Sequence, residues 1–207
     1  MPKHTITSRE ELRSIYKQPG EGAVKKALSQ LDPHCIAFIA RSPFCVLSTS
    51  DQNGRLDASP KGGDPGFLKV RDASTVLLPD WPGNNRLDSF ENILDNPHVG
   101  LMLMIPGMDE TLRLNGSAVL STDPALREEL SIKGKLPISV LVITVEDVYI
   151  HCARALWRSD LWNAEKHINR VDFPSMGQIL ADQVAGYDAA AVDKLIADNR
   201  NNLYALD

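Results

Sequence analysis

The chain has 207 residues, of which 43% are hydrophobic and 24% are charged, and its formal net charge is −5 at pH 7. This composition is typical of a one-domain globular protein, and the negative charge argues against non-specific binding to nucleic acid. Its apolar runs are far shorter than the roughly 20 residues that a membrane-spanning helix needs. The absence of an apolar signal segment and the three widely spaced cysteines predict a cytoplasmic protein without disulfides or membrane association.

The first forty residues are expected to form a helical lead-in. A helix is predicted at 8–16, because Ser8 precedes a glutamate three residues later, as in a capping box. A second helix is predicted at 21–31, with Val24, Ala27 and Leu28 on one face. A third should follow Pro33.

From Phe44 onwards the hydrophobic pattern becomes that of β-strands. Residues 45–50 and 55–59 flank the turn Asp51-Gln52-Asn53-Gly54, and Asn-Gly is a hairpin signature. Further strands are predicted at 67–70, 75–78, 99–104, 111–120, 139–145 and 148–151. Helices are predicted at 88–94, after Pro124, and at 175–184 and 188–199. The pattern predicts an α+β protein built on an antiparallel sheet or barrel.

Several familiar site motifs do not occur in the sequence. There is no GxGxxG, GxxxxGK[ST] or GxSxG, which argues against Rossmann, P-loop and α/β-hydrolase enzymes. No CxxC or HxxxH spacing indicates a metal site. His151 and Cys152 are adjacent rather than spaced as a nucleophile and its base, so a cysteine hydrolase is disfavoured.

Residues 78–94 are the first candidate for a ligand site. An apolar strand passes through Pro82-Gly83-Asn84-Asn85 to Arg86 and then into a helix opened by Asp88 or Ser89. Small residues let backbone amides approach a ligand, a helix N-terminus offers unpaired N–H groups, and arginine can bind phosphate with two hydrogen bonds. The alternative is an ordinary strand-to-helix loop with one surface arginine.

Basic residues at strand ends or on polar strand faces form a second signal: Lys61, Arg86, Arg113, Arg154 and Arg158. A phosphate-bearing ligand held by several strands would explain them, and scattered surface charge is the alternative. Residues 153–162 add Trp157 and Trp162 to two of these arginines. This segment is either a wall over a planar ring or an amphipathic helix with core aromatics.

Five segments in order carry a family resemblance: 41–44, 57–63, 78–89, 110–116 and 149–162. Through them the chain resembles the pyridoxamine 5'-phosphate oxidase-like flavoproteins, in the FMN-dependent branch of the FMN-binding split-barrel family. The resemblance covers roughly residues 30 to 165. It implies an antiparallel six-stranded split β-barrel with N-terminal and C-terminal helices. The expected parts are a helical lead-in at 1–40, an FMN-binding split barrel at 41–162 and a helical extension at 163–207.

The resemblance also implies a homodimer with one FMN per subunit at its interface. One strand would line the isoalloxazine ring with Asp57, Ala58, Ser59, Pro60 and Lys61. Pro79 and Asp80 would lie where the next strand meets the flavin. Asn85 and Arg86 would grip the phosphate, with Lys61 offsetting the basic residue that Asn85 replaces.

Two further groups of residues are implied around the same cofactor. Thr111 and Arg113 fall near the position of a glutamine that contacts the ring in the family. Arg154, Trp157 and Arg158 would reach across from the partner subunit. A cation near the N1/O2 edge, Arg113 or Lys61, would stabilise reduced anionic flavin. A backbone amide near Ser59 would bond to N5.

The resemblance predicts an FMN-dependent oxidoreductase acting on an unidentified small organic substrate. Its redox partner would be NAD(P)H or a reduced deazaflavin, and no catalytic residue is assigned. The alternative is a non-catalytic flavin- or haem-binding protein on the same barrel, with His151 as the haem ligand. The substrate-gripping segment of true pyridoxamine phosphate oxidases has no counterpart near the C-terminus. Pyridoxamine phosphate is therefore not the expected substrate.

Overall fold

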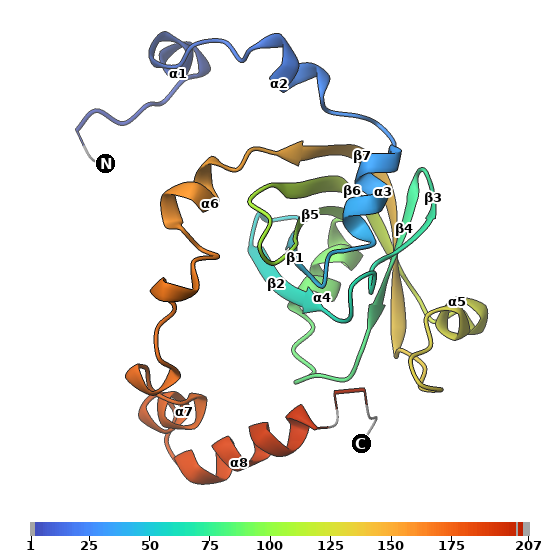
Figure 1. Cartoon of the computed structure of the whole chain (residues 1–207), viewed down its shortest axis with the longest axis vertical. Helices are drawn as coiled ribbons and strands as arrows, with labels where there is room; N and C mark the ends of the chain where they lie inside the picture. Colours follow the sequence, from blue (N-terminus) through green and yellow to red (C-terminus); the bar gives the residue numbers. More distant parts are fainter. Residues whose placement is uncertain (1–2, 202, 205–207) are drawn as a thin grey trace.

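Seven antiparallel strands form one open sheet in the order β2-β1-β5-β6-β7-β4-β3 (Figure 1). The computed structural model describes residues 3–201, 203 and 204. The strands are β1 (Phe44–Ser50), β2 (Leu56–Gly62), β3 (Lys69–Asp72), β4 (Thr75–Asp80), β5 (His98–Met104), β6 (Thr111–Ser121) and β7 (Ser139–His151). β2 and β3 are the two edges, and the sheet curls so that β2 lies across a gap from the end of β4.

The helices fall into two groups. Those against the sheet are α3 (Pro33–Ile39), α4 (Asp88–Asp95) and α5 (Pro124–Glu129). Those that project from it are α1 (Arg9–Ile15), α2 (Glu21–Lys25), α6 (Arg154–Ser159), α7 (Met176–Gln183) and α8 (Ala189–Arg200), with short 3-10 helices η1 (Ala164–Lys166) and η2 (Arg170–Asp172) (Figure 1). Helices α1, α2, α6 and α8 bury no residue. No helix within the described residues has both the length and the apolar character needed to cross a membrane.

The expectation of six strands is wrong, because the sheet has seven. The four-residue strand β3 pairs with β4 alone and adds an edge. In contrast, the two strands predicted at 139–145 and 148–151 are a single strand, β7. A bulge allows this, since Asn115 pairs with Asp147 and Gly116 with Val145, leaving Glu146 as an extra residue. The α+β class and the antiparallel pairing are as predicted.

The core lies inside the curled sheet and follows the alternation of the strands. Leu112 and Leu114 of β6 are fully buried, whereas Arg113 between them is exposed on the outer face. Helix α3 adds Phe38 and Ile39 to this core, and α4 adds Ile93. The Asn-Gly hairpin also forms as predicted, with β1 paired to β2 along its length.

All three cysteines are free thiols, as expected from their odd number and wide spacing. Cys35 and Cys45 are buried, and Cys152 is exposed. Burial raises the pKa of Cys35 to about 11 and that of Cys45 to about 12. Both buried thiols are therefore protonated at neutral pH and act as small apolar core residues.

Candidate functional site

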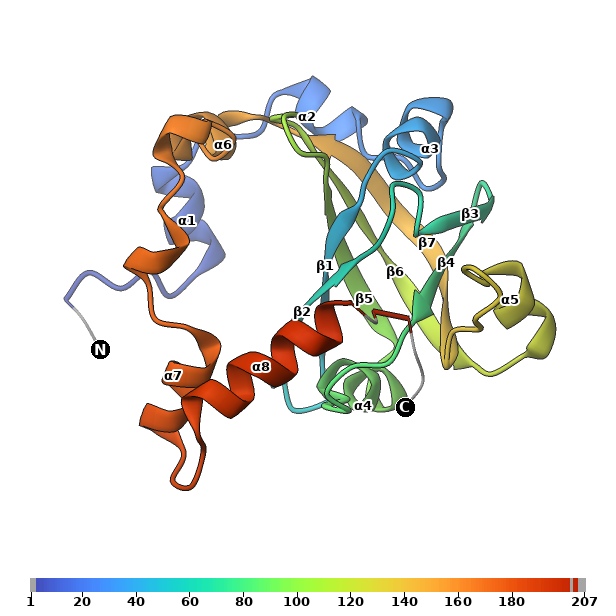
Figure 2. The same ribbon diagram turned by 60° about the horizontal axis from the view of Figure 1, so that its bottom comes forward.

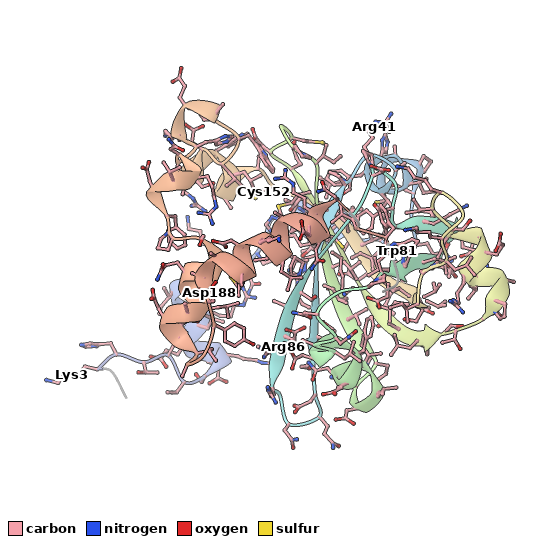
Figure 3. All side chains as sticks on the ribbon, turned by 90° about the horizontal axis from the view of Figure 1, so that it is seen from below. Lys3, Arg41, Trp81, Arg86, Cys152 and Asp188 are labelled. Atoms are coloured by element: carbon pink, nitrogen blue, oxygen red, sulfur yellow. The ribbon has the colours of Figure 1, made fainter. Side chains whose placement is uncertain are left out.

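A pocket of about 690 Å³ opens between β2, the adjoining ends of β4 and β7, and the segment that leads from β4 into α4. Its lining comprises residues 57–61, 80, 81, 83–90, 138 and 139. This volume lies within the range of roughly 300–1,000 Å³ that is usual for small-molecule sites. Figure 3 shows Trp81 and Arg86, which both lie on the segment between β4 and α4.

Strand β2 forms one wall of the pocket. Its register places Ser59 opposite Leu47 and Lys61 opposite Cys45, so both share the inner face of the sheet with buried residues. Ala58 and Pro60 alternate with them and are exposed. Because β2 is an edge strand, part of its backbone is not paired within the sheet and is open to a ligand.

An ion pair joins β2 to the end of β4 across the gap. Lys61 Nζ lies 3.6 Å from Asp80 Oδ1, and only 23% and 18% of the two side chains are exposed. The same ammonium lies 5.1 Å from the centre of the Phe90 ring, within cation–π distance. Burial raises the pKa of Asp80 above its ordinary value of 3.8, although the Lys61 charge opposes this shift.

The raised pKa of Asp80 predicts a specific pH dependence of stability. The folded chain binds more protons than the unfolded chain in the pH range just above 3.8, so this carboxyl lowers the free energy of unfolding as pH rises through that range. We expect Asp80→Asn to remove this contribution to the fall in the free energy of unfolding with rising pH. The slope of melting temperature against pH, measured by circular dichroism between about pH 3.5 and pH 6.5, should therefore be more positive in Asp80→Asn than in the wild type.

The matched control is Asp64→Asn, because Asp64 is exposed and lies outside the pocket. This variant should keep the pH profile of the wild type. Equal slopes for wild type and Asp80→Asn would contradict the assignment of the raised carboxyl pKa to Asp80.

The start of α4 forms the opposite rim. Its N-cap residue, Leu87, makes no side-chain capping bond, so the first amides of this helix have no side-chain partner there. Asn85 has φ 56°, a left-handed conformation that asparagine tolerates better than most residues. This turn brings Arg86 to the rim, where 73% of its side chain is exposed and its Nε donates to Asp88. Helix amides and an arginine together suit an anion.

Three polar contacts hold α4 against the sheet. Ser89 donates its hydroxyl hydrogen to the Asp57 carboxylate. Asn92 Nδ2 donates to Thr49 Oγ1 over 3.0 Å, and Asn96 Nδ2 donates to a β1 hydroxyl over the same distance. The rim of the pocket therefore belongs to a helix fixed on β1 and β2 rather than to a free loop.

Most of the residues predicted to contact FMN from within the same chain lie together in the structure. Those that line the pocket are Asp57, Ala58, Ser59, Pro60, Lys61, Asp80, Asn85 and Arg86. Pro79 is buried directly beside them on β4. The distant segments 57–61 and 80–86 thus form one site, although whether these residues bind a cofactor stays a prediction.

The other predicted residues lie outside this pocket. Thr111 is buried at the start of β6, and Arg113 lies on the outer face, where its Nη1 donates to Tyr149 Oη over 3.2 Å. The exposed residues Arg154, Trp157 and Arg158 are on α6, beyond the end of β7. Within one chain these five side chains do not join the lining.

One wall of the pocket was predicted only in part from the sequence. Trp81, Phe90 and Ile138 supply its apolar surface, and Ser139 lies beside them. Ile138 and Ser139 are brought there by the pairing of β4 with β7, since Asp80 pairs with Ser139. Trp81 and Phe90 lie within the candidate segment 78–94 although neither was named as a site residue, whereas no local signal pointed to Ile138.

Residues 31–152 match the sequence model of the pyridoxamine 5'-phosphate oxidase family. The match covers more than half of the 207 residues and contains every strand of the sheet. The chain belongs to the pyridoxamine 5'-phosphate oxidase family. The predicted resemblance is thus confirmed, and the pocket lies within the part shared with this family, whereas α1, α2 and α6–α8 lie outside the match.

Several solved structures are similar to this member of the oxidase family. HupZ of Group A Streptococcus is 19% identical, with 58% of this chain and 93% of that chain covered and a TM-score of 0.47. An FMN-binding protein of Syntrophomonas wolfei is 13% identical, with coverages of 56% and 81% and a TM-score of 0.44. General Stress Protein 26 of Bacillus anthracis is 16% identical, with coverages of 56% and 94% and a TM-score of 0.42. No curated protein matches the sequence.

Proposed function

We propose that this chain binds FMN in the pocket between β2 and α4 and acts as an FMN-dependent oxidoreductase on a small organic substrate. The observation that carries the proposal is one pocket, in a member of this family, with an apolar wall at one side and, at the other, a rim formed by Arg86 and the uncapped start of α4. Trp81, Phe90 and Ile138 suit a flat ring. Arg86 and the uncapped start of α4 suit a phosphate.

The charge of the pocket bears on how FMN is held. Asp57, Asp80 and Asp88 oppose Lys61 and Arg86, so the charged lining of one chain has a formal charge of −1. A phosphate would also compete with Asp88 for Arg86. Further cations are therefore needed, and none of the other described residues that line the pocket carries one.

A homodimer would provide those cations. We propose that Arg154 and Arg158 of the partner subunit complete the site, with Trp157 of the partner subunit beside them. Helix α6 supports this, since it buries none of its own residues and 63% of Trp157 is exposed. The projecting helices also carry exposed apolar side chains that a second copy would cover, among them Ile15, Tyr16, Val24, Leu195 and Ile196.

When bound, FMN supplies two-electron redox chemistry at its isoalloxazine ring. The chain holds and orients that ring and shields it from water. Lys61 is the only cation on the β2 wall, and it would favour negative charge near the ring. Arg113 faces the outer side of the sheet, so a role for it at the ring would require the partner subunit.

The test of this function begins with FMN titration of the purified chain, followed by flavin fluorescence. We expect saturable binding of one FMN per chain, loss of the oxidised flavin spectrum with NAD(P)H or a reduced deazaflavin, and its return with an organic acceptor. Light scattering should show a dimer. A chain that takes up no FMN would exclude the proposal, and a monomer would exclude the cross-subunit role of Arg154 and Arg158.

The non-catalytic alternative has its own signature in the same experiment. FMN binding without reduction by any donor would favour a flavin carrier. Haem uptake with a Soret band, lost in His151→Ala, would favour the haem-binding alternative. His151 is exposed at the end of β7 and lies outside the pocket.

A further inference from the structure

The C-terminal arm, residues 160–201, 203 and 204, is anchored to the barrel at both ends. At its root, Trp162 Nε1 donates to the Met108 carbonyl over 2.9 Å, and Trp157 Nε1 of the preceding helix donates to Asp109 Oδ2 over 2.8 Å. Both acceptors belong to the turn between β5 and β6. At the far end, the ring of Tyr204 contacts the ring of Trp81, with centroids 4.9 Å apart and an interplanar angle of 75°.

Between these anchors, helices α7 and α8 of the arm pack against each other. Gly177 N in α7 donates to Asp193 Oδ1 in α8 over 2.8 Å. A Cβ atom at Gly177 would lie 2.1 Å from the Ala189 carbonyl oxygen, so only glycine allows the two helices to approach this closely. Figures 1 and 2 show α8 running from α7 back towards α4 and the chain that follows β4. The two helices therefore carry Tyr204 to the pocket side of the barrel.

At the far end of the arm, Tyr204 is less exposed than the described residues around it. Tyr204 is half-buried, whereas its neighbour Leu203 is 63% exposed. The other large aromatic residues of the arm beyond its root, Phe173 and Tyr187, are 57% and 52% exposed. Tyr204 thus differs from them in having an aromatic partner, and that partner, Trp81, lines the pocket.

We propose that Tyr204 backs the Trp81 wall of the flavin site, held against Trp81 by the C-terminal arm. An edge-to-face pair of this kind is a favoured aromatic geometry, and it extends the apolar wall of the pocket beyond Trp81. Tyr204 is not itself among the residues that line the pocket, so it acts on the bound cofactor through Trp81, which it covers from outside. The identity of the ligand rests on the proposed function, whereas the contact of Tyr204 with Trp81 does not.

The contact of Tyr204 with Trp81 can be tested without any ligand. The chain has three tryptophans, Trp81, Trp157 and Trp162, so 5-fluorotryptophan labelling gives three ¹⁹F resonances that Trp→Phe variants assign. Tyr204→Ala should shift the Trp81 resonance and leave the two root tryptophans unchanged. Tyr204→Phe, which keeps the ring, and Leu203→Ala should leave all three in place. An unchanged Trp81 resonance in Tyr204→Ala would overturn the proposal.

The second measurement is the rate at which FMN leaves the full-length protein. Loss of one aromatic contact should speed dissociation roughly twofold to tenfold in Tyr204→Ala, with Tyr204→Phe and Leu203→Ala close to the wild type. Equal rates of FMN dissociation from Tyr204→Ala and the wild type would overturn the proposed role of Tyr204 at the flavin site. If the wild type binds no FMN, the proposed function fails together with the flavin part of this inference, and the ¹⁹F result still decides whether Tyr204 covers Trp81.

Discussion

Replacing Arg86 with alanine is expected to weaken FMN binding roughly tenfold to a hundredfold, the usual effect of losing a hydrogen bond between charged groups. Among the described residues that line the pocket, Arg86 is the only cation on the α4 side, and its partner there is Asp88. The variant therefore removes the cation and also leaves the Asp88 carboxylate unpaired beside the phosphate. The dissociation constant from flavin fluorescence titration checks this result.

The matched control for Arg86→Ala is Arg71→Ala, since Arg71 is an exposed arginine on β3 outside the pocket. It should bind FMN as the wild type does. Both variants should keep the wild-type melting temperature, because surface ion pairs contribute little to stability. FMN affinity that is unchanged in Arg86→Ala would contradict the phosphate position proposed at the start of α4.

Gly116→Ala is expected to destabilise the fold by about 3 kcal/mol or more, which places it among the severe single substitutions. A Cβ atom at this position would lie 1.9 Å from the Thr144 carbonyl oxygen and 3.0 Å from its carbonyl carbon. Both atoms are backbone of β7, next to the bulge, and cannot move without breaking the longest strand pairing of the sheet. Urea denaturation followed by circular dichroism measures the loss.

Gly22→Ala is the control for this effect. Gly22 lies in α2, and a Cβ atom there would meet nothing within 4 Å. The variant should be as stable as the wild type or slightly more stable, because alanine favours helix over glycine. Equal denaturation midpoints for Gly116→Ala and the wild type would show that the bulge tolerates a side chain.

Local signals in the sequence were enough for much of the site. The Asn-Gly turn predicted the β1–β2 hairpin, and the short helix after Arg86 was predicted from its opening residues. The polar residues of β2 and the turn at Asn85 were also predicted as site residues, and they line one pocket. These features depend on residues close in sequence, so turn chemistry and strand alternation suffice to find them.

Non-local pairing decided what the sequence analysis left out or got wrong. Residues 139–151 form one strand because β7 pairs with β6 across a bulge opposite Asn115 and Gly116, and the residues of β7 alone do not reveal this pairing. Ile138 enters the pocket through the pairing of β4 with β7, and Tyr204 reaches Trp81 across 123 residues through the packing of α7 on α8.

The sequence by itself determined the family, the antiparallel class and the residues of the two segments that face each other across the pocket. Only the tertiary structure decided that Lys61 pairs with Asp80, that Arg113 faces outwards, and that the pocket of one chain carries more carboxylates than cations. The physical reason is that side-chain type and spacing specify local conformation, whereas burial and charge pairing depend on which distant segments the folded sheet brings together.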